Sequence, residues 1–125
     1  AQKLADEWIN SGKELYESAG WFCYCFLISH KSDDFFDKEK IYGYLKRIEN
    51  TIHNSYNRTR YAMNNFVITV GISYKPLFKE ALDVARKIGK VYVDMKNTSC
   101  KTPIATEYIK KAVENNKIGI KKKYN

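Results

Sequence analysis

The sequence is poor in the residues that make tight turns, since its 125 residues include only two prolines and six glycines. An all-β fold needs many such turns, so their scarcity argues against one. Long hydrophobic runs are missing as well: the longest, residues 21–28, has eight residues, whereas a membrane-spanning helix needs roughly 18. The amino-terminal segment also lacks the apolar core of a signal peptide. We therefore expect a mainly helical globular domain with no membrane partner.

Cysteine and histidine are scarce too, with three cysteines and two histidines. An odd number of cysteines cannot all pair within one chain and nothing indicates secretion, so we expect reduced thiols and a cytoplasmic protein. Cys23 and Cys25 are two residues apart and point in different directions on a helix, which suits packing better than a disulfide or a zinc site. A cysteine or metal enzyme would need His30 or His53 close to Cys100 in the folded protein. We expect no metal and no cofactor.

Acidic residues are outnumbered, with 14 aspartates and glutamates against 22 lysines and arginines and a net charge of +8. The imbalance is uneven, because residues 1–37 carry three basic and seven acidic residues while residues 38–125 carry 19 and seven. Such asymmetry indicates a polyanionic partner, nucleic acid above all. A merely solvated basic surface is the alternative. A DNA-binding protein of this kind would be associated with the nucleoid.

Apolar residues recur with the spacing of amphipathic helices along most of the chain. The pattern predicts six helices, at residues 2–10, 13–30, 38–54, 58–72, 76–88 and 103–115. Three helix starts carry recognisable signals: a capping box at Ser11 and Glu14, Pro76 in a first turn, and Thr102 as an N-cap before Pro103.

Short connections make neighbouring helices antiparallel, so the chain divides into three pairs. Pairs of this length stacked side by side predict an all-α fold, a HEAT-like α-solenoid over residues 1–115, with a compact helical bundle as the alternative. The second half of segment 13–30 is apolar on every side, so we expect it to be the central helix. Residues 90–101 are predicted to be an ordered loop, and residues 116–125 a mobile basic tail.

One set of segments is distinctive in its order and spacing: residues 58–64 (RTRYAMN), 70–71 (VG), 88–94 (IGKVYVD) and 98–103 (TSCKTP). With the Trp21 helix and residues 49–53, they resemble the carboxy-terminal half of the bacterial DNA alkylation repair family. This HEAT-repeat group includes the AlkD-type 3-methyladenine and 7-methylguanine DNA glycosylases. The resemblance covers nearly the whole chain. It implies the carboxy-terminal part of a longer protein, an α-solenoid whose basic concave face binds duplex DNA, alkylated or not.

The same resemblance implies excision of N3- or N7-alkylated purines by the full-length protein. In those glycosylases a tryptophan, an aspartate one helical turn later and an arginine on a following helix assist the chemistry. If Trp21 occupies the tryptophan's position, Cys25 stands in place of the aspartate, and the arginine's position falls near Ile68. A carboxylate would stabilise positive charge developing on the sugar. The resemblance therefore assigns no catalytic residue in this chain.

The predicted DNA contacts are basic residues within the helix at 38–54, at the start of the helix at 58–72, in the 90–101 loop and in the tail: Arg47, Arg58, Arg60, Lys101, Lys121, Lys122 and Lys123. A cation at a helix start opposes the helix dipole at a cost of about 0.3–1 kcal/mol, which a phosphate contact would offset. A local ion pair with Glu49 or another acidic residue is the alternative for Arg58 and Arg60. The three tail lysines also suit a plain solubilising terminus, and Trp21 is a candidate stacking surface.

Four polar residues are assigned to a structural loop: Asn64, Asp94, Cys100 and Thr102. We expect Asn64 to hydrogen-bond the 90–101 loop, and the other three to fasten the last helix pair rather than to present Lys101 to phosphate. The rival function is a non-catalytic scaffold for protein–protein interaction. A DNA binder should gather its arginines on one concave face, whereas a scaffold should expose an apolar groove and disperse its charge.

Overall fold

The computed structural model describes residues 1–94 and 102–123, and within them the chain is helical with no strand. The α-helices are α1 (Gln2–Ile9), α2 (Glu14–His30), α3 (Lys38–Thr51), α4 (Asn57–Ser73), α5 (Phe78–Ile88) and α6 (Ala105–Glu114). Three short 3₁₀ turns lie between them: η1 (Asp33–Phe35), η2 (Ile52–Asn54) and η3 (Lys75–Leu77). No helix in these two ranges is long and apolar enough to cross a membrane.

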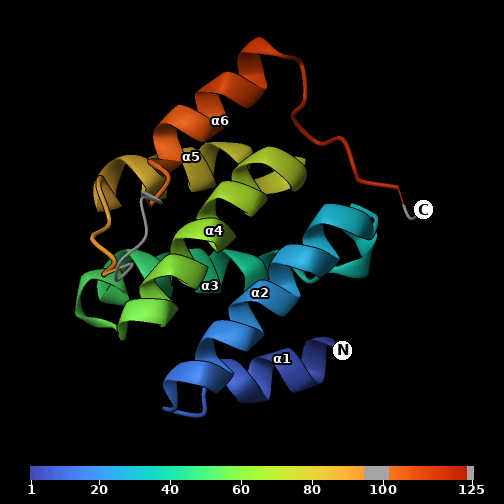
Figure 1. The fold of residues 1–125 in the computed structure, drawn as a ribbon. Helices are drawn as coiled ribbons and strands as arrows, with labels where there is room; N and C mark the ends of the chain where they lie inside the picture. The colour runs from blue at the N-terminus through green and yellow to red at the C-terminus, as the bar shows by residue number, and fades with distance from the viewer. Residues whose placement is uncertain (95–101, 124–125) are drawn as a thin grey trace.

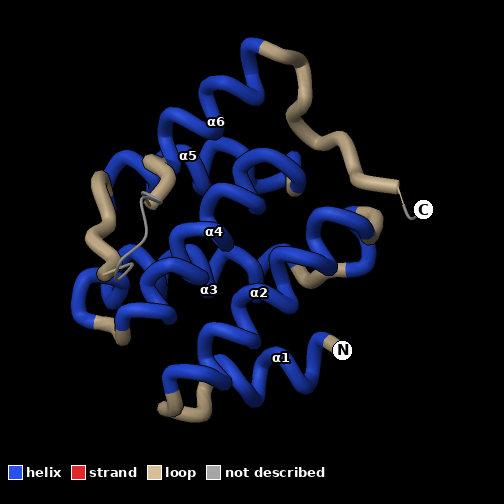
Figure 2. Tube along the Cα trace, viewed as in Figure 1, coloured by secondary structure: helices blue, strands red, loops and turns tan. Residues whose placement is uncertain are grey.

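The helices form two layers (Figures 1 and 2). Helices α2, α4 and α6 run side by side in one direction, and α1, α3 and α5 run in the opposite direction. Successive helices are therefore antiparallel pairs stacked along one axis. This arrangement confirms the predicted all-α, HEAT-like α-solenoid.

The core lies between the layers, around an aromatic cluster from three helices. Trp21 and Tyr24 of α2 meet Tyr44 of α3 and Phe66 of α4, edge to face, with ring centroids 5.0–6.2 Å apart. Trp21, Tyr24 and Phe66 are fully buried. Such pairs contribute about 0.5–1.5 kcal/mol each beyond the burial of their area.

Helix α4, rather than α2, is the central helix, so the prediction for α2 is wrong. Helix α4 contacts α2, α5 and α6, and most of its residues are buried. Helix α2 leaves Phe22 42% exposed and Phe26 51% exposed. The apolar run of α2 is thus not fully covered by the described part of the chain, and one uncovered strip borders the site described below.

Two glycines let the helices approach closely. A Cβ on Gly20 of α2 would lie 2.8 Å from the carbonyl oxygen of Ala5 in α1. A Cβ on Gly71 of α4 would lie 2.5 Å from Ile109 Cδ1 in α6. By contrast, nothing lies within 4 Å of a Cβ built on Gly43 of α3.

A partly buried carboxylate ties the first three helices together. Asp6 of α1 accepts hydrogen bonds from the hydroxyls of Tyr24 and Tyr44 and pairs with Lys40 at 2.8 Å. Burial on its own raises the pKa of Asp6, but the hydrogen bonds from Lys40 and the two tyrosines outweigh it and hold the pKa below its ordinary value.

The predicted capping box at the start of the second helix does not form. Ser11 Oγ accepts a hydrogen bond from the Lys13 backbone N–H at 3.2 Å, but the Glu14 carboxylate does not reach back. Instead it accepts a hydrogen bond from the Arg58 backbone N–H, at 2.9 Å, in the first turn of α4. A tertiary cap of this kind satisfies a free N–H and suits the positive end of the α4 dipole.

Two other helix starts are later than predicted. Pro76 lies in η3, and α5 begins at Phe78. Helix α6 begins at Ala105 with Ile104 as its N-cap, so Thr102 is not the cap and precedes the helix. Asp37, by contrast, caps α3 by accepting a hydrogen bond from a backbone N–H of its first turn.

The carboxy-terminal segment is fastened to the body by Lys121. Its ammonium donates to the carbonyl of Ile28 at 2.8 Å and to that of Ser73 at 2.7 Å, and it lies 2.8 Å from an Asp33 carboxylate oxygen. Ile28 and Ser73 are in the last turns of α2 and α4, where carbonyls have no partner within the helix. One lysine therefore caps two helices at the negative ends of their dipoles.

Backbone hydrogen bonds continue this attachment along the same edge. Gly119 N–H donates to the Ile72 carbonyl at 2.6 Å, and Lys122 N–H donates to the Ser29 carbonyl at 2.7 Å. Figure 1 shows the segment running from the end of α6 towards the ends of α4 and α2. The prediction of a mobile tail is therefore wrong for its described residues.

Candidate nucleic-acid interface

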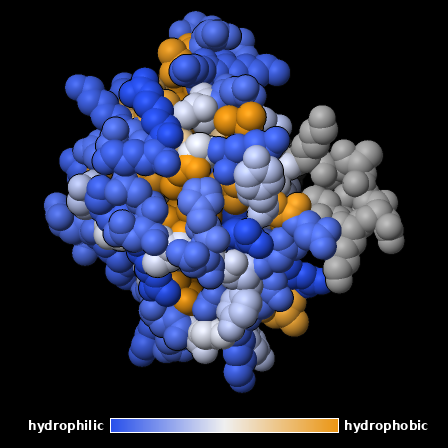
Figure 3. Space-filling view, turned by 90° about the vertical axis from the view of Figure 1, so that its left-hand side faces the viewer, coloured by the Kyte–Doolittle hydropathy of each residue, from blue (hydrophilic) through white to orange (hydrophobic). Residues whose placement is uncertain are grey.

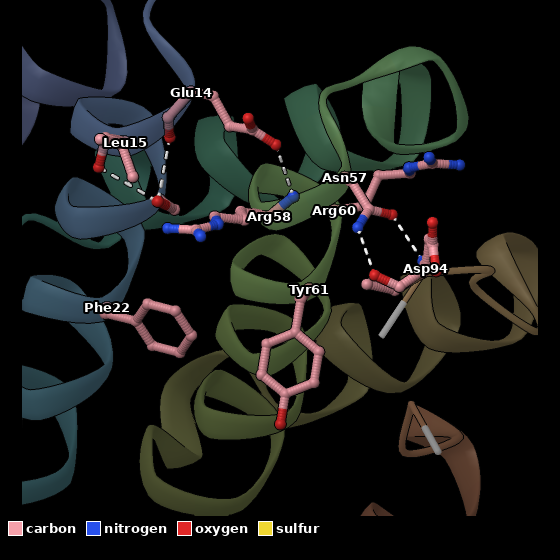
Figure 4. A pocket seen from close by; sticks show the side chains of 10 residues that line it. Glu14, Leu15, Phe22, Asn57, Arg58, Arg60, Tyr61 and Asp94 are labelled. Atoms are coloured by element: carbon pink, nitrogen blue, oxygen red, sulfur yellow. Dashed lines mark hydrogen bonds between the residues drawn. The ribbon is translucent and has the colours of Figure 1, made fainter. Parts of the chain in front are cut away.

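A cleft of about 1030 Å³ opens between the first turns of α2 and α4 (Figure 4). Its walls come from the amino-terminal half of α2, the first two turns of α4 and the segment that follows α5. The helix starts bring these walls together because α2 and α4 run parallel and make the most extensive helix contact in the fold. The cleft thus lies where two helices begin side by side.

One wall is held by a reciprocal pair of hydrogen bonds. The side-chain amide of Asn57 donates to the Asp94 carbonyl at 2.7 Å, and its oxygen accepts from the Asp94 backbone N–H at 2.7 Å. This pairing ties the segment after α5 to the first residue of α4. Asp94 is therefore a structural residue of the wall, and the amide of Asn57 is engaged on both its atoms.

Arg58 supplies a cation that faces the cleft. Its side chain extends from α4 towards α2 (Figure 4) and is exposed. Within residues 1–94 and 102–123, its guanidinium makes no hydrogen bond or ion pair. The alternative of a local pair with Glu49 is wrong, because Glu49 pairs with Lys46 at 3.0 Å and Lys87 at 3.7 Å.

Arg60 also borders the cleft but leaves α4 in another direction (Figure 4), as positions two apart on a helix must. Its Nε is buried and has no hydrogen-bond partner among the described residues. An unpaired buried donor costs about 1–3 kcal/mol. Arg60 therefore adds positive charge to the cleft wall, but its Nε is not accessible to a ligand in the cleft.

Two aromatic rings line the floor of the cleft. Phe22 of α2 and Tyr61 of α4 face each other with ring centroids 6.2 Å apart and planes tilted by 47° (Figure 4). Seen from the end at which α2 and α4 begin, hydrophilic side chains cover most of the surface, and hydrophobic residues show between them (Figure 3). The cleft therefore combines a small apolar floor with a polar rim, in which Arg58 and Arg60 stand beside the carboxylates of Glu14 and Asp94.

Arg47, predicted to join this face, is engaged elsewhere. Its guanidinium donates to Asn10 Oδ1 at 2.6 Å and to the Ile9 carbonyl at 3.2 Å, and it lies 6.0 Å from the centre of the Trp21 ring. It thus caps the end of α1 from α3. Arg47 does not line the cleft that Arg58 and Arg60 border, because a free helix carbonyl binds it, and a DNA contact at Arg47 stays a prediction.

Trp21 cannot serve as a stacking surface, because its ring is fully buried against Tyr44 and Phe66. The two positions aligned with the glycosylase residues are also packed into the fold. Burial raises the pKa of the Cys25 thiol to about 12, so it is neutral at neutral pH. Ile68 is 7% exposed. Neither position offers a charge to a departing base.

The other predicted residues are spread over the molecule. Lys121 is a structural cap, and the exposed Lys122 and Lys123 follow it at the end of α2 farthest from the cleft. Asn64 is fully buried and donates to the Pro103 carbonyl at 2.8 Å, so its partner lies beyond the 90–101 loop. Lys101 and Cys100 lie outside the described residues.

Sequence reasoning missed Phe22, Tyr61, Asn57 and Glu14. The aromatic residues gave no signal because exposed and buried rings look alike in an apolar helix. Asn57 was visible only as a helix-breaking residue, and Glu14 pointed to a local cap instead of a tertiary one. Across the part of the chain that the structure describes, no three His, Cys, Asp or Glu side chains gather as a metal ion would need.

Comparison with known proteins gives three similarities. A family model described as DNA alkylation repair enzyme matches residues 1–109. The chain is 39% identical over 109 residues to the uncharacterized proteins Lmo0209 of Listeria monocytogenes and Lin0241 of Listeria innocua, an alignment that covers 87% of this chain and 46% of each relative.

The third similarity is to a solved structure from a family related to the HEAT-like repeat DNA glycosylases with affinity for branched DNA structures. It is 44% identical, has a TM-score of 0.92, and is matched over 100% of this chain and 53% of its own length. The chain therefore spans about half the length of the relatives that it matches.

Proposed function

The chain belongs to the DNA alkylation repair enzyme family, as its sequence resemblance predicted, and on that premise we propose that it binds the DNA backbone through the cleft between α2 and α4. The observation that carries the proposal is the exposed Arg58 guanidinium, which faces the cleft and is not neutralised by any described residue. A guanidinium binds a phosphate through parallel N–H donors, so it suits a DNA backbone well.

The surroundings of Arg58 support an anionic ligand. The α4 amino terminus adds a positive partial charge, although the Glu14 carboxylate already takes one of its N–H groups. Arg60 adds a second positive charge to the same wall. The net charge of +8 would speed the approach of DNA without selecting a sequence.

Branched DNA is the form of DNA that we propose as the preferred ligand, together with the duplex arms that flank the branch. The support is the 44% identical structural relative, whose family has affinity for branched DNA structures. Backbone contacts alone fit duplex arms equally well, so preference for a branch would come from other parts of the cleft or of the whole protein.

Excision of N3- or N7-alkylated purines is the second candidate function, and it is supported by the family match. In this chain the aligned positions carry a neutral thiol at Cys25 and a buried Ile68. A carboxylate that stabilises the developing sugar cation would therefore come from elsewhere in the full-length protein. The test is whether the full-length protein releases alkylated bases from DNA. Release supports this function, and no release would refute it.

The binding proposal is tested with a four-way junction and a linear duplex of the same arm sequence, each labelled with a fluorophore. Anisotropy is measured between about 50 and 200 mM salt, where each phosphate contact lowers log K by about 0.9 per log unit of salt. We expect salt-dependent binding of both forms and tighter binding of the junction. An absence of binding even at low salt would overturn the proposal and favour a protein scaffold.

A further inference from the structure

The apolar floor of the cleft has no role in binding a phosphate. Phe22 is 42% exposed, and the cleft is also lined by Leu15, which is 64% exposed about two turns earlier on α2. The exposed part of the Phe22 ring adds no stability to the fold, because full burial of a Phe side chain contributes about 1.5–3 kcal/mol and this ring is only partly buried against Tyr61. A planar apolar ligand would remove the ring from water.

The polar groups around the floor narrow the choice of ligand. Arg58 extends over the cleft from the α4 side, above the Phe22 and Tyr61 rings in Figure 4. A ligand that fills the cleft therefore meets a cation at one end and two aromatic rings at the other. A nucleotide has this composition, with a phosphate at one end and a flat base at the other.

We propose that the cleft holds one unpaired nucleotide of a branched or gapped DNA, with its base stacked on Phe22, the Tyr61 ring against the edge of the base, and its phosphate on Arg58. This inference rests on the proposed DNA binding and names what distinguishes a branch from a duplex: a paired base is stacked inside the helix and does not present its face. The volume of about 1030 Å³ is at the upper end of the roughly 300–1,000 Å³ of small-ligand pockets, ample for one nucleotide.

The ring geometry fixes how the base stacks. Inserting a base between two rings needs roughly 7–8 Å between their planes, since each contact is about 3.5–4.0 Å. The Phe22 and Tyr61 centroids are only 6.2 Å apart and their planes are tilted by 47°. The base therefore lies on the exposed face of Phe22, with the Tyr61 ring against its edge, and is not sandwiched.

The same neighbourhood predicts weak base selectivity. The amide of Asn57, which could read a base edge, is fully engaged by the Asp94 backbone. The hydroxyl of Ser18 donates within α2, to the carbonyls of Glu14 and Leu15. Stacking on an aromatic ring is tolerant of sequence because every base has a π face.

The test uses the chain with a duplex that carries one unpaired nucleotide, and with the same duplex in which that nucleotide is an abasic spacer. Stacking contributes about 1–3 kcal/mol per base, so we expect the abasic form to bind roughly 5- to 150-fold more weakly. Phe22→Ala should bind the duplex with the unpaired nucleotide more weakly by the same factor, and should bind the abasic duplex with the affinity of the native chain. F22Y should retain the affinity of the native chain for both duplexes.

Phe35→Ala is the matched control, because Phe35 is 44% exposed and lies in η1, outside the cleft. Y61A should reduce the discrimination and Y61F should preserve it, and far-UV circular dichroism checks that each variant is folded. Equal affinity of the native chain for the base and the abasic spacer would overturn the inference while leaving salt-dependent DNA binding intact. Equal losses in F22A and F35A would also overturn it. An absence of all DNA binding would overturn both proposals.

Discussion

Lys121 gives the sharpest prediction about stability. Changing it to methionine keeps most of the hydrocarbon stem but removes the ammonium that caps α2 and α4 through the Ile28 and Ser73 carbonyls. The Lys121 side chain is only 21% exposed, and its Asp33 partner is 38% exposed. The lost contacts are thus partly shielded from water.

The magnitude follows from these contacts. A hydrogen bond from a charged donor contributes about 1.5–3 kcal/mol when buried, and an exposed ion pair about 0–1 kcal/mol. Water can replace part of the lost bonding at the helix ends, so we expect Lys121→Met to lower the free energy of unfolding by about 2–4 kcal/mol. That is a large share of the roughly 5–15 kcal/mol that holds a domain together.

Urea denaturation of the native chain, Lys121→Met and Lys123→Met measures this difference. Lys123 is exposed and is two residues away, so its replacement should change stability by less than about 0.5 kcal/mol. If Lys121→Met and Lys123→Met unfold at the same urea concentration, the reasoning that Lys121 fastens the two helix ends is refuted.

Three further predictions concern the rest of the fold and the cleft wall. Asp6→Asn should be less stable than the native chain at neutral pH. Folding lowers the pKa of Asp6, so this difference in the free energy of unfolding is complete above the ordinary pKa of 3.8 and is lost as pH falls through the lower pKa of the folded state. Urea unfolding of both proteins across a pH series measures it. Gly43→Ala should stabilise by about 0.5–1 kcal/mol and Gly20→Ala should destabilise by about 1–3 kcal/mol, since only the second Cβ meets the backbone of Ala5; thermal melts distinguish them. Asn57→Ala should speed amide hydrogen exchange at Asp94 by roughly tenfold or more, as expected when hydrogen bonds of about 1–2 kcal/mol are lost.

The helix content and the fold class could be predicted because they depend on local patterns. Apolar spacing along α3 places Ile41, Leu45 and Ile48 on one buried face, and the structure has them fully buried. The order of the helices then makes antiparallel pairs the simplest arrangement. Family membership was visible in short segments whose order and spacing matter more than any one of them.

The roles of single charged residues could not be predicted, because their partners are distant in sequence. Lys121 binds a carbonyl 93 residues away, and Glu14 caps α4 through the N–H of Arg58, 44 residues later. A free helix-end carbonyl has no sequence signature, so Arg47 and Lys121 were indistinguishable from solvent-facing cations. Only Arg58 and Arg60 of the predicted DNA contacts border the cleft among the described residues.

The central claim is that the Arg58 guanidinium in the cleft binds the DNA backbone. Its most direct test compares the salt dependence of DNA binding by Arg58→Gln and by Arg86→Gln. Arg86 is an exposed arginine in the last turn of α5, so both variants lose one exposed positive charge. We expect R58Q to bind duplex and junction about 5- to 20-fold more weakly and its slope of log K against log salt to be shallower by about 0.9, while R86Q stays close to the native chain. Equal affinities and equal slopes in the two variants would contradict the account.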